Sequence, residues 1–249
     1  MSLESTRRDL LRNSIAFGTV GLSTATVLSV PLVGKPVPEE SKKGEDEKEP
    51  EVTATEDLMR EHGVIRRALL VYYEVIPKLR QNAGSIDAAA LQQTAKLFRT
   101  FGEDYHERML EEQHIFPLIR KQGSELAHYA DILTQQHQRG REVTDYVLAV
   151  TDSGKISAAH AEPLAKVFET FVLMYQNHAA REDTIVFPAW KKNFTDKQLD
   201  EIGDQFEDIE HKMFGKDGFE DAEKKISDIE AELGFADLAQ FTPPAPPKP

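Results

Sequence analysis

The sequence predicts an all-α protein, an antiparallel four-helix bundle with an additional C-terminal helix or two. Apolar residues recur every three or four positions through several long segments, as along the buried stripe of an amphipathic helix. No segment alternates apolar and polar residues for long enough to predict a strand. The turns between the long segments are short, which favours antiparallel neighbours.

The N-terminal residues are predicted to lie outside the bundle. Arg7 and Arg8 precede a Leu-Leu pair and an uncharged, mildly apolar run, so residues 1–38 resemble a twin-arginine export signal. A membrane anchor and a chance basic start are the alternatives, because no small-residue cleavage site is clear. Residues 39–55, EESKKGEDEKEPEVTAT, are charged and lack an apolar period, which predicts a disordered acidic linker.

The bundle itself is predicted over residues 56–214, including a fifth helix. Its helices are expected over about 55–79, 85–121, 124–148, 156–192 and 195–214. Gly123 and Gly154 end the second and third helices, and Thr195 is a typical first residue for the fifth. Residues 215–249 form the C-terminal extension, with a short helix near 219–233 and a tail, TPPAPPKP, that cannot pack as a helix.

Composition limits the kind of site this chain can hold. The sequence has 249 residues and no cysteine, which excludes disulfides, a thiolate nucleophile and a cysteine-ligated metal. A metal must therefore be bound by His, Asp, Glu or water, as suits non-haem iron, manganese or zinc. The formal net charge of −13 disfavours a nucleic-acid partner.

Two segments repeat the same arrangement of histidine, carboxylates and proline. Tyr175 to Trp190 reads YQNHAAREDTIVFPAW and places Glu182 four residues after His178, on one helix face. Asp104 to Pro117 reads DYHERMLEEQHIFP, with Glu111 five residues after His106. In both segments a carboxylate lies six residues before the proline. An imidazole and a carboxylate in an apolar stripe are costly to bury unpaired, and a divalent cation would pair with both.

Each of the four long helices carries one histidine in its apolar stripe: His62, His106, His137 and His178. A single such histidine is more often a hydrogen-bonded core residue than a ligand. Because the chain direction reverses at each turn, all four could share one layer of the bundle. Four such stripes, two of them followed by carboxylates, predict a dinuclear metal site inside the bundle.

The spacing in the second helix requires a local irregularity. Five residues rotate about 500° in an ideal α-helix, which leaves His106 and Glu111 about 140° apart. A π-bulge between the two residues would return them to a common face, and such bulges occur frequently at functional sites.

These segments resemble the hemerythrin-like, or His-His-Glu (HHE) cation-binding, family over about residues 56–214. The resemblance rests on REHG at His62, YHERMLEEQHIFP at His106, QQHQRGRE at His137 and NHAAREDTIVFP at His178. It implies a four-helix bundle that holds a non-haem di-iron centre. It also implies reversible dioxygen binding, oxygen or redox sensing, or the handling of iron or nitric oxide.

The resemblance also implies a set of metal ligands. His62 and His106 would bind one iron, His137 and His178 the other, and Glu111 and Glu182 would bridge the two. The family often has a second histidine one turn after the third-helix ligand, where this sequence has Arg141. The second iron would then have an open position for water, dioxygen or a replacement carboxylate, for which Glu107 is a candidate.

Other ligand assignments are open at this stage. Asp183 competes with Glu182, because it has the five-residue spacing from His178 that oxygen-carrying hemerythrins show in the last helix. His114 follows Glu111 in an E-x-x-H pattern, but the fourth helix has no matching pattern. His128 and His160 are expected at the surface or in caps, and His211 is expected to pack or to support a ligand.

The sequence therefore predicts an exported di-iron protein that binds dioxygen or a related small ligand such as nitric oxide or peroxide. Its location would be the periplasm or another extracytoplasmic compartment, with membrane contact only through an uncleaved signal. A di-iron oxidase or peroxidase is one alternative, in which Glu107 or His114 would handle protons. A non-catalytic iron store or metallochaperone is another.

Overall fold

The computed structural model describes residues 52–247, and all regular elements in this range are helical. The predicted export signal and most of the predicted linker lie outside the described residues. Helix α2 (Ala54–Asn82) begins within the last two residues of the predicted linker. The side chain of Thr53 caps it by accepting the N–H of Glu56 at 3.3 Å. Among the described helices, none is both long enough and apolar enough to cross a membrane.

The second predicted helix consists of several consecutive elements. After a 3₁₀ turn, η2 (Ala83–Ser85), α3 (Ala88–Leu97) begins at Asp87, whose carboxylate accepts the N–H groups of Ala89 and Ala90. The chain then continues as a π-helix, η3 (Phe98–Ile115), and ends in α4 (Phe116–Ile119). The predicted π-bulge is confirmed, and the π-helical register covers far more than one turn.

The third and fourth predicted helices follow with the expected boundaries. α5 (Ser124–Thr151) starts after Gly123, which has a positive φ of 124°. α6 (Ala158–Arg181) continues through a π turn, η4 (Glu182–Val186), into α7 (Phe187–Lys191). The sequence did not predict this second π segment.

The two π segments end in the same way. The N–H of Phe116 donates to the carbonyl of Glu111, and the N–H of Phe187 donates to the carbonyl of Glu182. Each bond spans five residues. A proline follows each phenylalanine, and proline has no N–H for the next α-helical bond. The wider turn therefore occurs where proline interrupts the α-helical pattern, beside a carboxylate of the predicted metal site.

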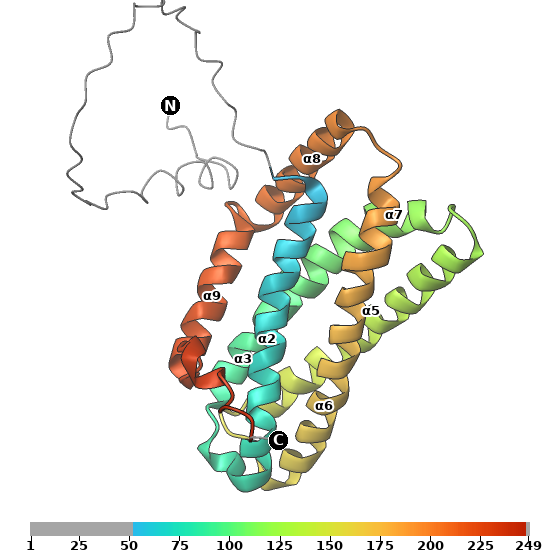
Figure 1. Ribbon diagram of the computed structural model, residues 1–249. Helices are drawn as coiled ribbons and strands as arrows, with labels where there is room; N and C mark the ends of the chain where they lie inside the picture. Colours follow the sequence, from blue (N-terminus) through green and yellow to red (C-terminus); the bar gives the residue numbers. More distant parts are fainter. Residues whose placement is uncertain (1–51, 248–249) are drawn as a thin grey trace, which may run out of the picture. The chain divides into compact units, whose positions relative to one another are not determined.

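The long helices surround a common apolar core. α2 packs against α6, α6 against α5, α5 against α3 and η3, and η3 against α2 (Figure 1). Aromatic rings fill much of this core. The ring centroids of Tyr72 and Phe168 are 4.4 Å apart in a stacked pair, and those of Phe98 and Tyr175 are 5.0 Å apart in an edge-on pair. The tightly packed core fixes the rotation of each helix, and hence the side chains that face inward.

The C-terminal helices pack against the outside of α2 and η3, and α9 also packs against α3. α8 (Asp196–Phe214) begins with a capping box between Thr195 and Gln198 and ends at Gly215, which is left-handed with φ 72°. α9 (Gly218–Leu233) then runs alongside α2 and α3 (Figure 1). A 3₁₀ turn, η5 (Leu238–Phe241), follows, and residues 242–247 have no regular structure, as predicted for the proline-rich tail.

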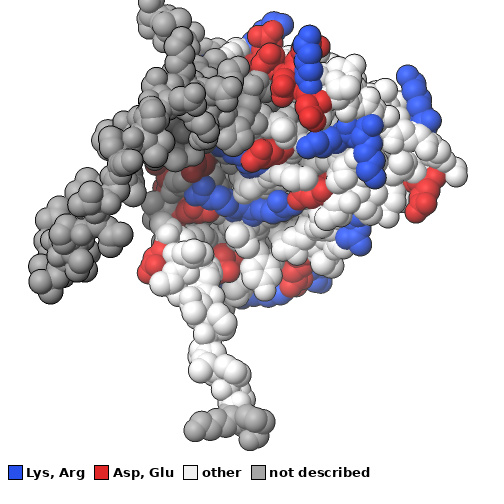
Figure 2. Space-filling view, turned by 45° about the horizontal axis from the view of Figure 1, so that its top comes forward, with Lys and Arg blue, Asp and Glu red and all other residues white. Residues whose placement is uncertain are grey.

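Charged side chains of both signs are interspersed on the surface. On the face shown in Figure 2, Lys and Arg side chains lie next to Asp and Glu side chains. Arg80 at the end of α2, for example, binds Glu162 and Glu169 on α6 at 3.0 and 2.7 Å. Exposed pairs of this kind contribute little to stability, because solvent and salt screen them. The surface therefore adds solubility more than stability.

Candidate metal centre

The predicted histidines come together in the interior of the bundle. His62 lies on α2, His106 on η3, His137 on α5 and His178 on α6, and none is more than 2% exposed. The rings of His62 and His106 are 4.6 Å apart, and those of His137 and His178 are 4.9 Å apart. The four imidazoles therefore form two neighbouring pairs.

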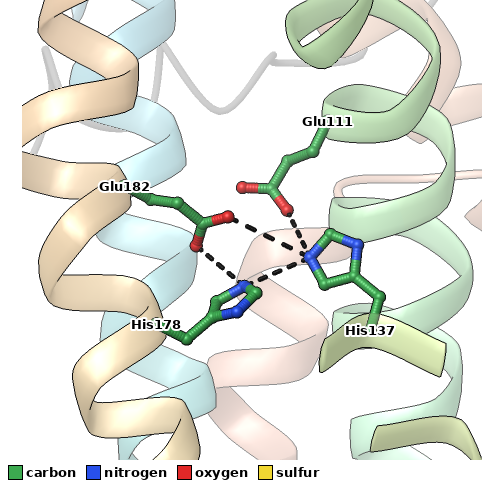
Figure 3. Close-up of side chains that lie close together, drawn as sticks. All are labelled: Glu111, His137, His178 and Glu182. Atoms are coloured by element: carbon green, nitrogen blue, oxygen red, sulfur yellow. Dashed lines mark hydrogen bonds and ion pairs between the residues drawn. The ribbon is translucent and has the colours of Figure 1, made fainter. Parts of the chain in front are cut away.

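Glu111 and Glu182 lie between the two pairs. Glu111 directs Oε1 toward Nε2 of His106 at 3.4 Å and Oε2 toward Nε2 of His137 at 3.2 Å. Glu182 directs Oε2 toward Nε2 of His178 at 3.0 Å and toward Nε2 of His62 at 3.5 Å. Figure 3 shows Glu111, His137, His178 and Glu182 converging on a common point. Each carboxylate thus reaches both histidine pairs.

These side chains have the geometry of cation ligands. One ligand atom from each of Glu111, His137, His178 and Glu182 lies within 4.8 Å of the others, and His62, His106 and Glu111 form a second such group. The two groups share Glu111. The Nε2 atoms of His137 and His178 are only 3.1 Å apart, a separation that suits two ligands of one cation.

The buried carboxylates of Glu111 and Glu182 lack hydrogen bonds. All four of their oxygens, and Nε2 of His106, are buried without a hydrogen-bond partner. Without a cation, the burial of these carboxylates is offset only by ion pairs with protonated imidazoles 3.0–3.5 Å away. A divalent cation would pair with these atoms, so the donor set fits a metal centre built from imidazole and carboxylate.

Each histidine is held from behind by an acceptor on its Nδ1 atom. The acceptors are Asp183 for His62 at 2.7 Å, Glu61 for His106 at 2.7 Å, Glu112 for His137 at 2.9 Å and Gln136 for His178 at 2.9 Å. This arrangement fixes the tautomer in which Nε2 is free to bind a metal. Sequence reasoning missed Glu61 and Gln136, although each immediately precedes a histidine that was predicted as a ligand.

Comparison with known families agrees with this geometry. The model of the hemerythrin HHE cation-binding domain matches residues 53–190. The chain belongs to this family. The HHE domain accounts for the helices from α2 to α7 and for all six predicted ligands, whereas α8 and α9 lie beyond the match.

Relatives of the whole chain are also found. Uncharacterized proteins of Mycobacterium tuberculosis and Mycobacterium bovis are 43% identical to it over 242 residues, covering 95% of this chain and 91% of theirs. No solved structure matches the chain. The similarity extends through the C-terminal helices, so the relatives have counterparts of α8 and α9 as well as of the HHE domain.

Asp183 and Glu182 take separate positions in the HHE domain. Glu182 faces the centre, whereas Asp183 lies outside it, bonded to His62 and to the guanidinium of Arg66. Neighbouring residues of a helix point about 100° apart, so Asp183 faces a different direction from Glu182. The structure therefore gives Asp183 the role of an outer partner of His62.

Arg141 lies one turn after His137 on α5, at the position where the family often has a second histidine. Its Nη2 donates to Glu112 Oε1 at 2.6 Å and to Glu107 Oε2 at 3.3 Å. The buried Glu107 also accepts the hydroxyl of Tyr175. Glu107 lies within 4.8 Å of ligand atoms of Glu112 and His137 but is outside the two groups that contain Glu111. It stays a candidate ligand, already bonded to Arg141 and Tyr175.

The remaining histidines lie apart from the centre. His114 is half-buried and meets Phe206 edge-on at 5.6 Å, which explains its spacing after Glu111 as packing. His128 and His160 are exposed, as expected, and His211 is half-buried in α8.

The imidazoles and carboxylates of the centre stabilise each other's charged forms. Burial by itself lowers the pKa of His106, but the carboxylates of Glu111 and Glu61 outweigh it and raise the pKa to about 10. Burial by itself raises the pKa of Glu182, but His178 and His62 lower it well below its usual range. A cation that binds these imidazoles must displace their protons, so metal binding is coupled to pH.

Proposed function

We propose that this chain is an exported non-haem di-iron protein that binds dioxygen or a related small ligand such as nitric oxide or peroxide. The observation that carries the proposal is the pair of buried carboxylates, without hydrogen bonds, between two pairs of imidazoles. Family membership supports cation binding, and a donor set of imidazole and carboxylate suits iron. When bound, iron would supply reversible redox chemistry and a position for the small ligand.

We assign His62 and His106 to one ion and His137 and His178 to the other, with Glu111 and Glu182 bridging them. The orientation of Glu111 supports the assignment, because its two oxygens point to Nε2 atoms of different histidine pairs. The four acceptors on the Nδ1 atoms orient the rings and increase the basicity of Nε2.

The open position for an external ligand belongs to the His137–His178 ion in this proposal. Arg141 cannot bind a cation, and its bonds to Glu112 and Glu107 neutralise charge beside the centre. All the proposed ligands are buried, which favours a small ligand over a bulky substrate.

We further infer that the long helices run antiparallel, as in other hemerythrin-like bundles. The pairing of Arg80 with Glu162 supports this, since it joins the last turn of α2 to the first turns of α6. The pairing of Arg99 with Asp145 joins an early residue of η3 to a late residue of α5. Export rests on the twin-arginine pattern at Arg7 and Arg8 alone.

Iron analysis of the purified full-length chain tests the function. Expressed with ample iron, the wild type should contain two irons per chain and show a charge-transfer band that differs between air and nitrogen. His178→Ala should lower the iron content, and His128→Ala, which changes an exposed histidine, should not. Near-zero iron in the wild type would refute the proposal. Sustained peroxide turnover lost in His178→Ala would make the protein an enzyme instead.

A further inference from the structure

The α8–α9 hairpin (196–233) packs against the helices that carry one half of the centre. Both helices contact α2 and η3, on which His62 and His106 lie. The guanidinium carbon of Arg60 lies 4.6 Å from the centroid of the Phe219 ring of α9. Arg60 is two residues before His62 in the sequence. The hairpin is therefore placed to influence one histidine pair, although it lies beyond the HHE domain match.

A series of contacts leads from the end of α8 to the ring of His106. Phe214, the last residue of α8, meets Tyr105 edge-on at 5.5 Å. The hydroxyl of Tyr105 donates to Glu61 Oε1 at 3.1 Å, and Glu61 Oε2 bonds Nδ1 of His106 at 2.7 Å. Tyr105, Glu61 and His106 are each 1% exposed, so solvent has little access to these bonds.

The turn between α8 and α9 holds the ring of Phe214 in place. A Cβ at Gly218 would lie 2.3 Å from Cδ2 of Phe214, so only glycine fits there. The buried carboxylate of Glu210 accepts the N–H of Phe219 at 2.6 Å and ties the two helices together. Phe214 is thus confined between the turn and Tyr105.

We propose that the hairpin is a positioning element for the His62–His106 metal position, and that Phe214 acts on it through Tyr105 and Glu61. The inference rests on the proposed metal-binding function. Loss of an outer partner of a ligand histidine typically lowers metal affinity about 10- to 100-fold. His137 and His178 are held by Glu112 and Gln136 instead, so the effect is confined to one of the two ions.

Titration of metal-free, full-length protein with cobalt(II), followed by visible absorption, tests the proposal. The wild type should bind two ions. Phe214→Ala should bind one ion with wild-type affinity and the other about 10- to 100-fold more weakly. Tyr105→Phe keeps the ring and removes the hydroxyl, and it should cause the same selective loss. The double variant should show no further weakening, because both changes break one pathway.

Phe206→Ala is the matched control. Phe206 is a buried aromatic residue of α8, but its ring packs against Trp190 and His114. This variant should retain both affinities, even if its thermal stability falls. If Phe214→Ala does not fold, Phe214→Leu keeps an apolar side chain in the turn and must show the same selective loss.

The outcomes separate the two proposals. Wild-type affinity for both ions in the Phe214 variant, or equal weakening of both, would overturn the role of the hairpin. Selective loss in Tyr105→Phe alone would also exclude it, since Tyr105 would then act without Phe214. A wild type that binds neither cobalt(II) nor iron would overturn the proposed function itself.

Discussion

Each histidine proposed as a ligand presents Nε2 to the centre because its Nδ1 atom is already bonded. Three of the four acceptors are carboxylates, and the fourth is the amide of Gln136 on α5. A carboxylate makes an imidazole more basic than an amide does, because it stabilises the positive charge. His178 is therefore the ligand whose orientation depends on a neutral partner.

Removal of the Gln136 amide should weaken metal binding without unfolding the protein. In Gln136→Ala, Nδ1 of His178 loses its acceptor at 2.9 Å, so the ring can adopt the other tautomer. We expect about a tenfold loss of affinity for one cation, measured by cobalt(II) titration. Gln135→Ala is the control, because Gln135 is the exposed neighbour. Unchanged affinity in Gln136→Ala would show that packing alone orients His178.

At the scale of elements, two π-helical segments contain the carboxylates that are proposed to bridge the ions. In η3 the wider turn brings His106 and Glu111 to one face, and Glu182 is the first residue of η4. The helices beyond the HHE match are ordinary α-helices that depend on caps. α8 begins at Thr195, whose hydroxyl accepts the N–H of Gln198 while the Gln198 side chain returns to the Thr195 N–H.

Loss of this capping box should destabilise α8. Thr195→Ala removes the acceptor for one unpaired N–H group at the helix start, which costs about 1 kcal/mol of unfolding free energy. Urea denaturation followed by circular dichroism measures the change. Thr170→Ala provides the comparison, since Thr170 is an exposed residue inside α6 and should change stability by less. Equal effects of the two substitutions would argue against the cap.

For the whole molecule, the buried centre makes stability depend on both pH and metal. The pKa of His106 is raised to about 10 from an ordinary value of 6.5, and those of His62 and His137 are also raised. A histidine with a raised pKa stabilises the fold fully below 6.5, and this contribution is lost as pH rises toward the folded value. A bound cation replaces the protons and adds its own binding energy.

The chelated protein should therefore lose thermal stability as pH rises from about 6.5 to about 10, because its histidines lose their charge beside the carboxylates. The iron-loaded protein should melt at a higher temperature and show a smaller decline over the same range. Circular-dichroism melting at several pH values, with and without a chelator, measures both curves. His128→Ala should reproduce the wild-type curves. Parallel curves for chelated and loaded protein would contradict this prediction.

The sequence by itself determined the helical class, most helix boundaries to within about three residues, and the six residues proposed as ligands. Apolar periodicity and glycine positions are local signals, so they locate helices well. The spacing of six residues from Glu111 to Pro117, repeated from Glu182 to Pro188, helped to predict the centre. The five-residue spacing of His106 and Glu111 predicted the π-bulge in the second helix.

Only the tertiary structure decided which of several adjacent carboxylates face inward. Glu182 lies in the centre and Asp183 outside it, because the packing of α6 against α2 and α5 sets the rotation that turns position 182 inward. The partnership of Glu61 with His106, 45 positions away, depends on how α2 packs against η3. Contacts between distant segments arise from helix packing, which no local spacing encodes, and the placement of α8 and α9 beside one histidine pair has the same origin.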